Sequence, residues 1–163
     1  MNGPALASTG DQVALAWFTA AGGEARVYVA LSSDAGGSFG APVRVDDGSP
    51  QGRVDVELLP DGSAVLLWLE SAEGRGALQA RRVFADGRRG PAVRVASVDG
   101  DRTSGHPRIV RSGNQLYLAW RARAPENRVV AAVANVPADA VRQILVPPAP
   151  GLRPRHDAAV DRQ

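Results

Sequence analysis

The segments Val13-Ala-Leu-Ala-Trp17, Ala64-Val-Leu-Leu-Trp68 and Leu116-Tyr-Leu-Ala-Trp120 are three versions of one apolar run, and together they hold all three tryptophans of the 163-residue chain. The tryptophans stand at positions 17, 68 and 120, so the run recurs at intervals of 51 and 52 residues. A fixed period of this length is typical of proteins built from stacked repeats. We therefore expect three tandem copies of one structural unit.

Each copy contains further segments with the character of β-strands. The pairs Gly10-Asp11, Asp61-Gly62 and Gly113-Asn114 precede the tryptophan runs, and such pairs tolerate the positive φ of tight hairpin turns. Other apolar runs recur after each tryptophan, first at 26–31, 77–83 and 129–133, and then at 40–45, 90–95 and 141–146. No helical periodicity of useful length is present, so the pattern predicts a four-stranded antiparallel meander in every copy.

The tryptophan strand is apolar on both faces, which is expected of a strand that neighbouring sheets cover on both sides. The predicted fold is all-β, with three four-stranded antiparallel blades of a β-propeller at 1–52, 53–105 and 106–146. Three blades are too few to close a ring, and we expect them to form half of a six-bladed one. Residues 147–163 read as a proline-rich linker and a disordered tail. Trp68, in the middle blade, should be the most deeply buried tryptophan.

Composition argues against several classes of partner and cofactor. All 19 basic residues are arginines scattered along the chain, 17 acidic residues nearly balance them, and only 5% of residues are aromatic, so nucleic-acid binding is not expected. No apolar stretch approaches the roughly 18 residues of a membrane span. Cysteine is absent and the two histidines lie far apart, so the sequence predicts no disulfide, metal site or cofactor.

Residues 32–39 read Ser-Ser-Asp-Ala-Gly-Gly-Ser-Phe, which matches the Asp-box pattern Ser-x-Asp-x-Gly-x-(Ser/Thr)-(Trp/Phe) at Ser32, Asp34, Gly36, Ser38 and Phe39. In a β repeat of this period, the segment resembles the bacterial neuraminidase repeat (BNR) of sialidase-like propellers. We interpret it as a structural clamp. Asp34 is expected to accept hydrogen bonds from turn amides, Gly36 to adopt a positive φ, and Phe39 to fill an apolar gap.

The resemblance implies a catalytic set that these residues do not supply. Sialidase-like enzymes bind a sugar carboxylate with three arginines, and they use a glutamate-polarised tyrosine as nucleophile and an aspartate as acid/base. This chain lacks the Arg-Ile-Pro segment of the first blade. Its only tyrosines, Tyr28 and Tyr117, lie in apolar strands, where a packing role is expected. No catalytic residue is therefore assigned.

Three functional interpretations follow. The preferred one is a non-catalytic, sialidase-like propeller segment with a binding or scaffold role inside a larger or dimerised propeller. The alternative is the C-terminal part of an exo-sialidase or related glycoside hydrolase. A third is a small protein that pairs two copies into a six-bladed ring. The missing blades would come from the same gene or from a second copy.

The meander also predicts where a ligand would bind. The connections between one blade and the next should lie at the same end of the sheets as the loop between the second and third strands of each blade. The first connection carries Asp46, Asp47 and Arg53, and the second carries Asp101, Arg102 and His106. These are either ordinary solvated charges or a polar site near the central channel. Arg53, Asp101, Arg102 and His106 are the candidate ligand-binding residues, with a glycan or acidic sugar as ligand.

The compartment is left open by the sequence. Met1-Asn-Gly-Pro4 carries no basic residue ahead of an apolar run, as a secretory signal would. A secreted or periplasmic location is expected if the chain is a piece of a sialidase-like protein, and a cytoplasmic one otherwise.

Overall fold

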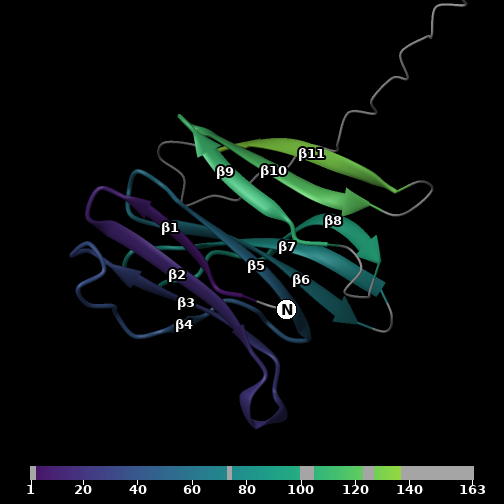
Figure 1. The fold of residues 1–163 in the computed structure, drawn as a ribbon, viewed down its shortest axis with the longest axis horizontal. Coiled ribbons are helices and arrows are strands. Elements are labelled where there is room, and N and C mark those ends of the chain that lie inside the picture. Colours follow the sequence, from purple (N-terminus) through teal and green to yellow (C-terminus); the bar gives the residue numbers. More distant parts are fainter. Residues whose placement is uncertain (1–2, 73–74, 100–104, 123–126, 137–163) are drawn as a thin grey trace, which may run out of the picture.

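The computed structural model describes residues 3–72, 75–99, 105–122 and 127–136. Three antiparallel sheets stack face to face, with the second between the first and the third (Figure 1). The first contains β1 (Ala5–Thr9), β2 (Gln12–Thr19), β3 (Arg26–Ser32) and β4 (Val43–Arg44). The second contains β5 (Pro50–Leu58), β6 (Ala64–Ala72), β7 (Arg75–Val83) and β8 (Val93–Asp99). The third contains β9 (Arg108–Ser112), β10 (Gln115–Ala122) and β11 (Arg128–Asn135).

The three sheets share one arrangement of strands. In each, the tryptophan strand lies second and pairs with the strand on either side. Trp17 stands opposite Tyr28, Trp68 opposite Gln79 and Trp120 opposite Val130. The all-β meander expected from the tryptophan spacing is therefore present.

Two apolar cores separate the three sheets. The first joins Ala14 and Val27 of the first sheet to Leu66 and Trp68 of the second. The other joins the opposite side of the second sheet, with Val65 and Leu78, to Leu118 and Trp120 of the third. Burial on both faces explains why β6 is apolar from Ala64 to Leu69. Trp68 is fully buried, Trp120 nearly so and Trp17 only partly, which confirms that Trp68 is the most deeply buried tryptophan.

Some elements differ from the sequence-based expectation. Only Val43–Arg44 of the expected run 40–45 pairs as a strand, because Pro42 just before it has no amide to donate. The strand β5 begins at Pro50 and so crosses the boundary drawn between residues 52 and 53. The predicted strand 141–146 and the tail 147–163 lie outside the described residues.

Helical structure in the described ranges amounts to the 3-10 turn Ala21–Gly23, far short of the roughly 20 residues that a membrane-crossing helix needs.

Side-chain carboxylates attach the third sheet to the second. Asp55 Oδ2 accepts the Ile109 amide at 2.8 Å, and Glu57 Oε2 accepts the Arg111 amide at 3.2 Å. The Arg111 guanidinium donates back to the Leu58 carbonyl at 2.9 Å. Two amides at the free edge of β9 are thus satisfied without a main-chain ladder between the sheets.

Candidate functional site

The two ends of the stacked sheets carry different kinds of loop. At one end the amide of Ala35, in the 32–39 turn, donates to the carbonyl of Asp11 at 2.7 Å. This bond joins the turn between β3 and β4 to the turn between β1 and β2, so both turns lie at the same end, as the meander predicts. The connection between β4 and β5 lies at the opposite end, and so do residues 106–108 at the start of β9.

The 32–39 turn is organised around Asp34. Its Oδ1 accepts the Ser32 hydroxyl at 2.7 Å and the Ser38 amide at 2.8 Å, while its Oδ2 accepts the Ser38 hydroxyl at 2.6 Å. The Ser32 hydroxyl oxygen in turn accepts the Gly36 amide at 3.0 Å, and Gly36 has a φ of 85°. The bonds from Ser38 and Ser32 lower the pKa of Asp34 to about 2.

Phe39 does not fill an apolar gap, contrary to the expectation. It is 40% exposed, because residues 39–42 form no strand and do not hold the ring against a core. The polar bonds of Asp34 hold this turn without the ring.

Replacing Asp34 by alanine is expected to lower the melting temperature near neutral pH, because several turn donors lose their acceptor. A carboxylate whose folded pKa is depressed contributes stability above the unfolded value of 3.8 and loses it as the pH falls toward 2. The difference in melting between wild type and Asp34→Ala should therefore be full at pH 6 and shrink between pH 4 and 2.

The matched control is Asp11→Ala, which removes a nearby carboxylate but keeps the main-chain oxygen that accepts from Ala35. This variant should melt like the wild type. An Asp34→Ala difference that stays constant from pH 6 to pH 2.5 would contradict the clamp.

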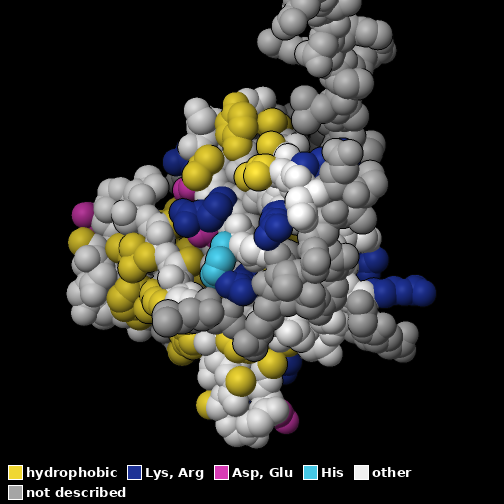
Figure 2. Space-filling model, turned by 45° about the vertical axis from the view of Figure 1, so that its right-hand side comes forward, with side chains coloured by type: hydrophobic (Ala, Val, Ile, Leu, Met, Phe, Trp, Pro, Cys, Tyr) yellow, Lys and Arg dark blue, Asp and Glu magenta, His cyan; other side chains and the backbone are white. Residues whose placement is uncertain are grey.

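At the opposite end, a hollow of about 380 Å³ lies where the three sheets begin. Its walls are residues 3–6 at the start of β1, Val54 and Asp55 of β5, and residues 106–108 at the start of β9. Figure 2 shows arginine side chains gathered around a histidine on the face it presents. The first strands of all three sheets converge here, and a rigid scaffold with polar groups at a concave surface is the usual setting of a ligand site.

Arg53 lies inside β5 and not on an exposed connection as expected. The pairing of β5 with β6 shifts between Gly52 and Asp55, which marks a bulge, and Arg53 there has a φ of 58°. A positive φ is costly for a residue with a Cβ and persists only where surrounding structure enforces it. The bulge re-aims the Arg53 guanidinium at the ring of His106, with Nη1 in contact with Nε2.

The Arg53 contact bears on the protonation of His106. Partial burial, reinforced by the positive charges of Arg53 and Arg108, lowers the pKa of His106 below its usual range. The ring is therefore neutral at pH 7, and its Nε2 accepts from the guanidinium. The two sequence candidates Arg53 and His106, 53 positions apart, form one cluster.

Two further residues of this cluster were missed from the sequence. Asp55 is buried, accepts Arg108 Nε at 3.1 Å, and lies next to the hollow. The guanidinium of Arg108 is itself mostly exposed. An acidic residue between Val54 and Val56 was the available signal for Asp55. The candidates Asp101 and Arg102 lie outside the described residues.

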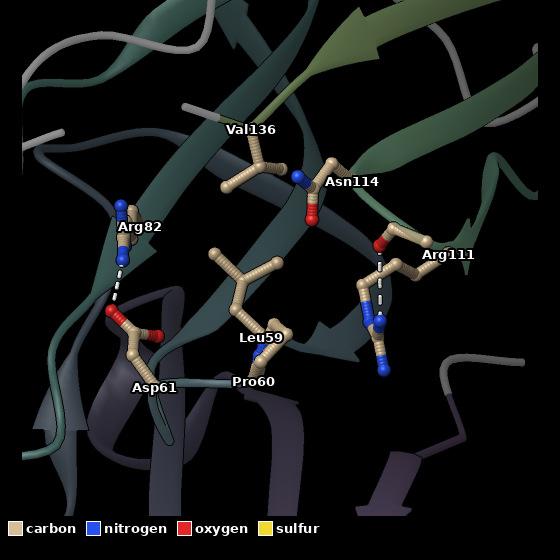
Figure 3. Close-up of a pocket in the computed structure, with 8 residues that line it drawn as sticks. Leu59, Pro60, Asp61, Arg82, Arg111, Asn114 and Val136 are labelled. Carbon is tan, nitrogen blue, oxygen red and sulfur yellow. Dashed lines mark hydrogen bonds and ion pairs between the residues drawn. The ribbon is translucent and has the colours of Figure 1, made fainter. Parts of the chain in front are cut away.

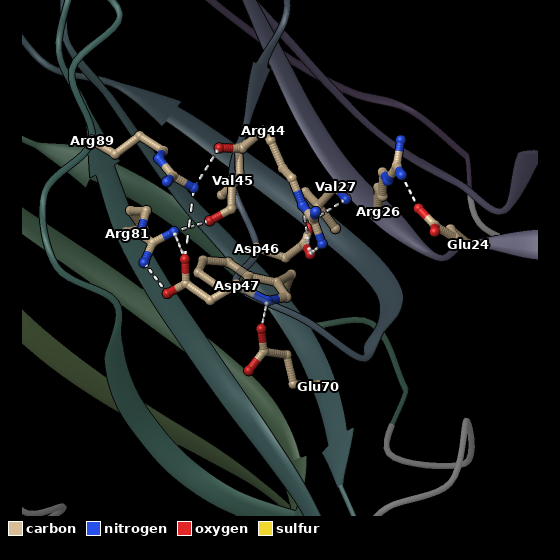
Figure 4. Close-up of polar contacts among 11 residues, drawn as sticks. Glu24, Arg26, Val27, Arg44, Val45, Asp46, Asp47, Glu70, Arg81 and Arg89 are labelled. Atoms are coloured by element: carbon tan, nitrogen blue, oxygen red, sulfur yellow. Dashed lines mark hydrogen bonds and ion pairs between the residues drawn. The ribbon is translucent and has the colours of Figure 1, made fainter.

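Asp46 and Asp47 serve the packing of the sheets (Figure 4). Asp46 was expected to be a solvated loop charge, but it is buried, because its Oδ1 accepts the Val27 amide at 2.6 Å and its Oδ2 accepts Arg44 at 2.7 Å. Asp47 stays exposed and pairs with the buried guanidinium of Arg81 in the second sheet. The Arg81 hydrogen bond holds the pKa of Asp47 below its usual range. Asp46 thus bonds to the first sheet and Asp47 to the second, and we call this pair of residues the latch between the two sheets.

A smaller hollow, of about 140 Å³, lies at the other end between the second and third sheets (Figure 3). Leu59, Pro60 and Val136 give it an apolar lining. The charges at its rim are engaged already, since Arg82 pairs with Asp61 and Arg111 donates to the Gly113 carbonyl at 3.0 Å. This hollow is a gap between two packed sheets, and it is a weaker candidate for a ligand site than the hollow beside Arg53 and His106.

Metal chemistry finds no support within the described ranges, where no group of three histidine or carboxylate side chains converges. The described residues also bring together no pair of carboxylates in the hollow, since Asp55 is the only acidic residue among those that line it.

Comparison with known proteins places the fold. No known protein family and no curated protein matches the sequence. Similar solved structures include Bacteroides ovatus xyloglucan PUL GH43B, with 17% identity and a TM-score of 0.56 over 91% of this chain. They also include a thermostable family-43 glycoside hydrolase, with 13% identity and a TM-score of 0.53 over 82% of this chain. The chain has the fold of propeller-type glycoside hydrolases.

The extent of the match limits what it implies. The aligned part is 28% of the first hydrolase chain and 50% of the second, so this chain spans half or less of each. Identities this low establish a shared fold only. The finer resemblance of residues 32–39 to sialidase repeats stays a prediction, as do the six-bladed ring and its number of blades.

Proposed function

We propose that this chain is a sugar-binding segment of a glycoside-hydrolase-type propeller, and that it binds a carboxylated sugar in the hollow formed by β1, β5 and β9. The observation that carries the proposal is the cluster of Arg53, His106 and Arg108 around that hollow. A guanidinium forms charge-assisted and often bidentate hydrogen bonds with a carboxylate, and a neutral imidazole bonds sugar hydroxyls.

The charge balance of the cluster favours an anionic ligand. Among the described residues that line the hollow, Asp55 is the one acidic side chain, and it already accepts from the Ile109 amide and Arg108. The exposed part of the Arg108 guanidinium and the Arg53 guanidinium leave a net positive site. Loss of a charge-assisted hydrogen bond typically costs about 1.5 to 3 kcal/mol, so the arginines should dominate affinity.

The second candidate is hydrolysis by a larger protein of which this chain forms part. The fold shared with family-43 hydrolases favours it, and so does the fraction of those chains that this one spans. The described residues contribute an acidic group, Asp55, but not the pair of carboxylates that glycoside hydrolysis generally requires. Catalysis would therefore need residues from outside the described part.

The test uses Arg53→Gly, because glycine removes the side chain and also accepts the positive φ at this position. Affinity for a carboxylated sugar should fall about 10- to 100-fold, whereas the melting temperature should hold or rise. Candidate ligands come from a glycan array, and titration calorimetry with methyl glucuronide against methyl glucoside isolates the carboxylate.

The control variant is Arg94→Gly, which removes an exposed arginine from β8, away from the hollow. It should bind like the wild type. Equal binding of the glucuronide and the glucoside, or equal losses in the two variants, would overturn the carboxylate assignment.

A further inference from the structure

Among the described residues, the first and third sheets each leave one face without a partner. We define the leading face as the side of a sheet that faces the preceding sheet, and the trailing face as the side that faces the following one. The first sheet has an open leading face, and the third has an open trailing face (Figure 1).

The open leading face of the first sheet resembles the leading faces of the second and third sheets, which another sheet covers. Residues at equivalent positions of the three sheets show this. Leu6, Val56 and Ile109 each pair with the residue two places before a tryptophan. Val56 and Ile109 are 4% and 3% exposed because a preceding sheet covers them, whereas Leu6 is 64% exposed. Trp17 and Tyr28 stack beside it, with ring centroids 5.7 Å apart.

The open trailing face shows the same contrast. Val27, Leu78 and Val129 each pair with the residue just after a tryptophan. The first two are fully buried, and Val129 is 73% exposed. Tyr117 and Val133, on the same side of the third sheet, are also exposed, so a packing role for Tyr117 does not hold within this chain.

The chain itself shows what covers such faces. In both internal cores, a trailing face with Val27 or Leu78 packs against a leading face that carries a tryptophan. The two open faces are therefore the two halves of one kind of interface. Isolated soluble domains seldom expose apolar patches of this kind unless they serve association.

We propose that a second copy of this chain covers both faces, with the trailing face of the third sheet of each copy seated on the leading face of the first sheet of the other. Two such contacts are related by a two-fold axis and close a ring of six sheets. This inference does not depend on the proposed sugar site, and it makes no use of residues outside the described ranges.

The new contacts should be weaker than the internal ones. The positions of Asp55 and Glu57 in the second sheet correspond to Arg108 and Val110 in the third, because each pair has the same register with the tryptophan strand. The third sheet therefore lacks the carboxylates that bond amides of the next sheet. We expect a reversible dimer with a Kd of about 1 to 10 µM.

The test is sedimentation of the full 163-residue chain between about 0.1 and 100 µM, which brackets that Kd. The mass should double across this range. Leu6→Glu and Val129→Glu should each weaken the dimer about 100-fold, because every dimer contains two contacts and a buried unpaired carboxylate costs about tenfold or more in each. Ala41→Glu, in the exposed connection between β3 and β4, is the charge-matched control and should leave dimerisation unchanged.

Mixing the two variants distinguishes head-to-tail contacts from symmetric ones. Leu6→Glu keeps a sound trailing face and Val129→Glu a sound leading face, so the mixture should form a heterodimer through one intact contact. Since both residues are already exposed in one copy, the variants should melt like the wild type when dilute.

A wild type that stays monomeric at 100 µM, or that assembles without limit, overturns the two-copy ring. Dimerisation that survives Leu6→Glu but not Val129→Glu overturns the head-to-tail arrangement.

Discussion

Replacing Trp68 by alanine should lower the free energy of unfolding by about 3 to 5 kcal/mol, the usual range for emptying a buried aromatic site. The indole is fully buried in the core between the first two sheets, and its Nε1 donates to Glu70 Oε1 at 2.9 Å. The substitution leaves a cavity between two stacked sheets, which cannot close without moving one of them. Chemical denaturation monitored by far-UV circular dichroism measures the effect.

Trp17→Ala is the matched control, because Trp17 holds the same repeat position on the open leading face of the first sheet. At concentrations where the chain is monomeric, Trp17→Ala should lower the free energy of unfolding by less than about half as much as Trp68→Ala. The reason is that the Trp17 side chain buries less apolar surface on folding. Equal costs for the two tryptophans would show that the sheets do not stack as described.

Asp46→Ala should destabilise the chain by about 2 to 4 kcal/mol, as expected when a buried acceptor is removed from its donors. The Val27 amide would lose its acceptor, because Tyr28 and Val29 are the only residues of β3 that pair with β4. Arg44 would lose its partner as well. The latch between the first two sheets should loosen, and hydrogen exchange should locate the change at Val27.

Asp86→Ala provides the comparison for this latch. Asp86 pairs with Arg88 in an exposed turn of the second sheet, and its substitution should leave unfolding unchanged within error. If Asp46→Ala is equally silent, water must replace the carboxylate at Val27 and the latch contributes nothing.

The period of the tryptophans was sufficient to predict the sheets, because a spacing near fifty residues and an apolar strand on both faces are properties of the local sequence. The deep burial of Trp68 followed from the same count, since only the middle sheet has two neighbours. Coverage of β6 by two cores reflects its unbroken apolar run from Ala64 to Leu69.

The candidate site was less accessible from the sequence. The bulge that turns Arg53 toward His106 depends on how β5 pairs with β6, and a local pattern of residues does not reveal that register. The burial of Asp46 likewise depends on the Val27 amide, which lies 19 positions earlier in the chain. Both side chains were identified as polar, but their surroundings are set by strands distant in sequence.

Ligand identity is a separate matter from geometry. Arg53 and His106 were chosen as site residues from their place in the meander, and the structure brings these two together. The sugar they bind is still a prediction, because the fold shared with family-43 hydrolases carries no information about the groups lining this hollow.

The carboxylates of Asp55 and Glu57, which bond β5 to β9, require the third unit to follow the second. In the first sheet, Ala5 and Ala7 hold the positions that Asp55 and Glu57 hold in the second, since each pair has the same register with its tryptophan strand. A rearranged gene that placed the third unit directly after the first would leave the Ile109 and Arg111 amides facing methyl groups. Gene duplication can copy the units, but they are not interchangeable. Asp55 and Glu57 specify which unit must precede the third.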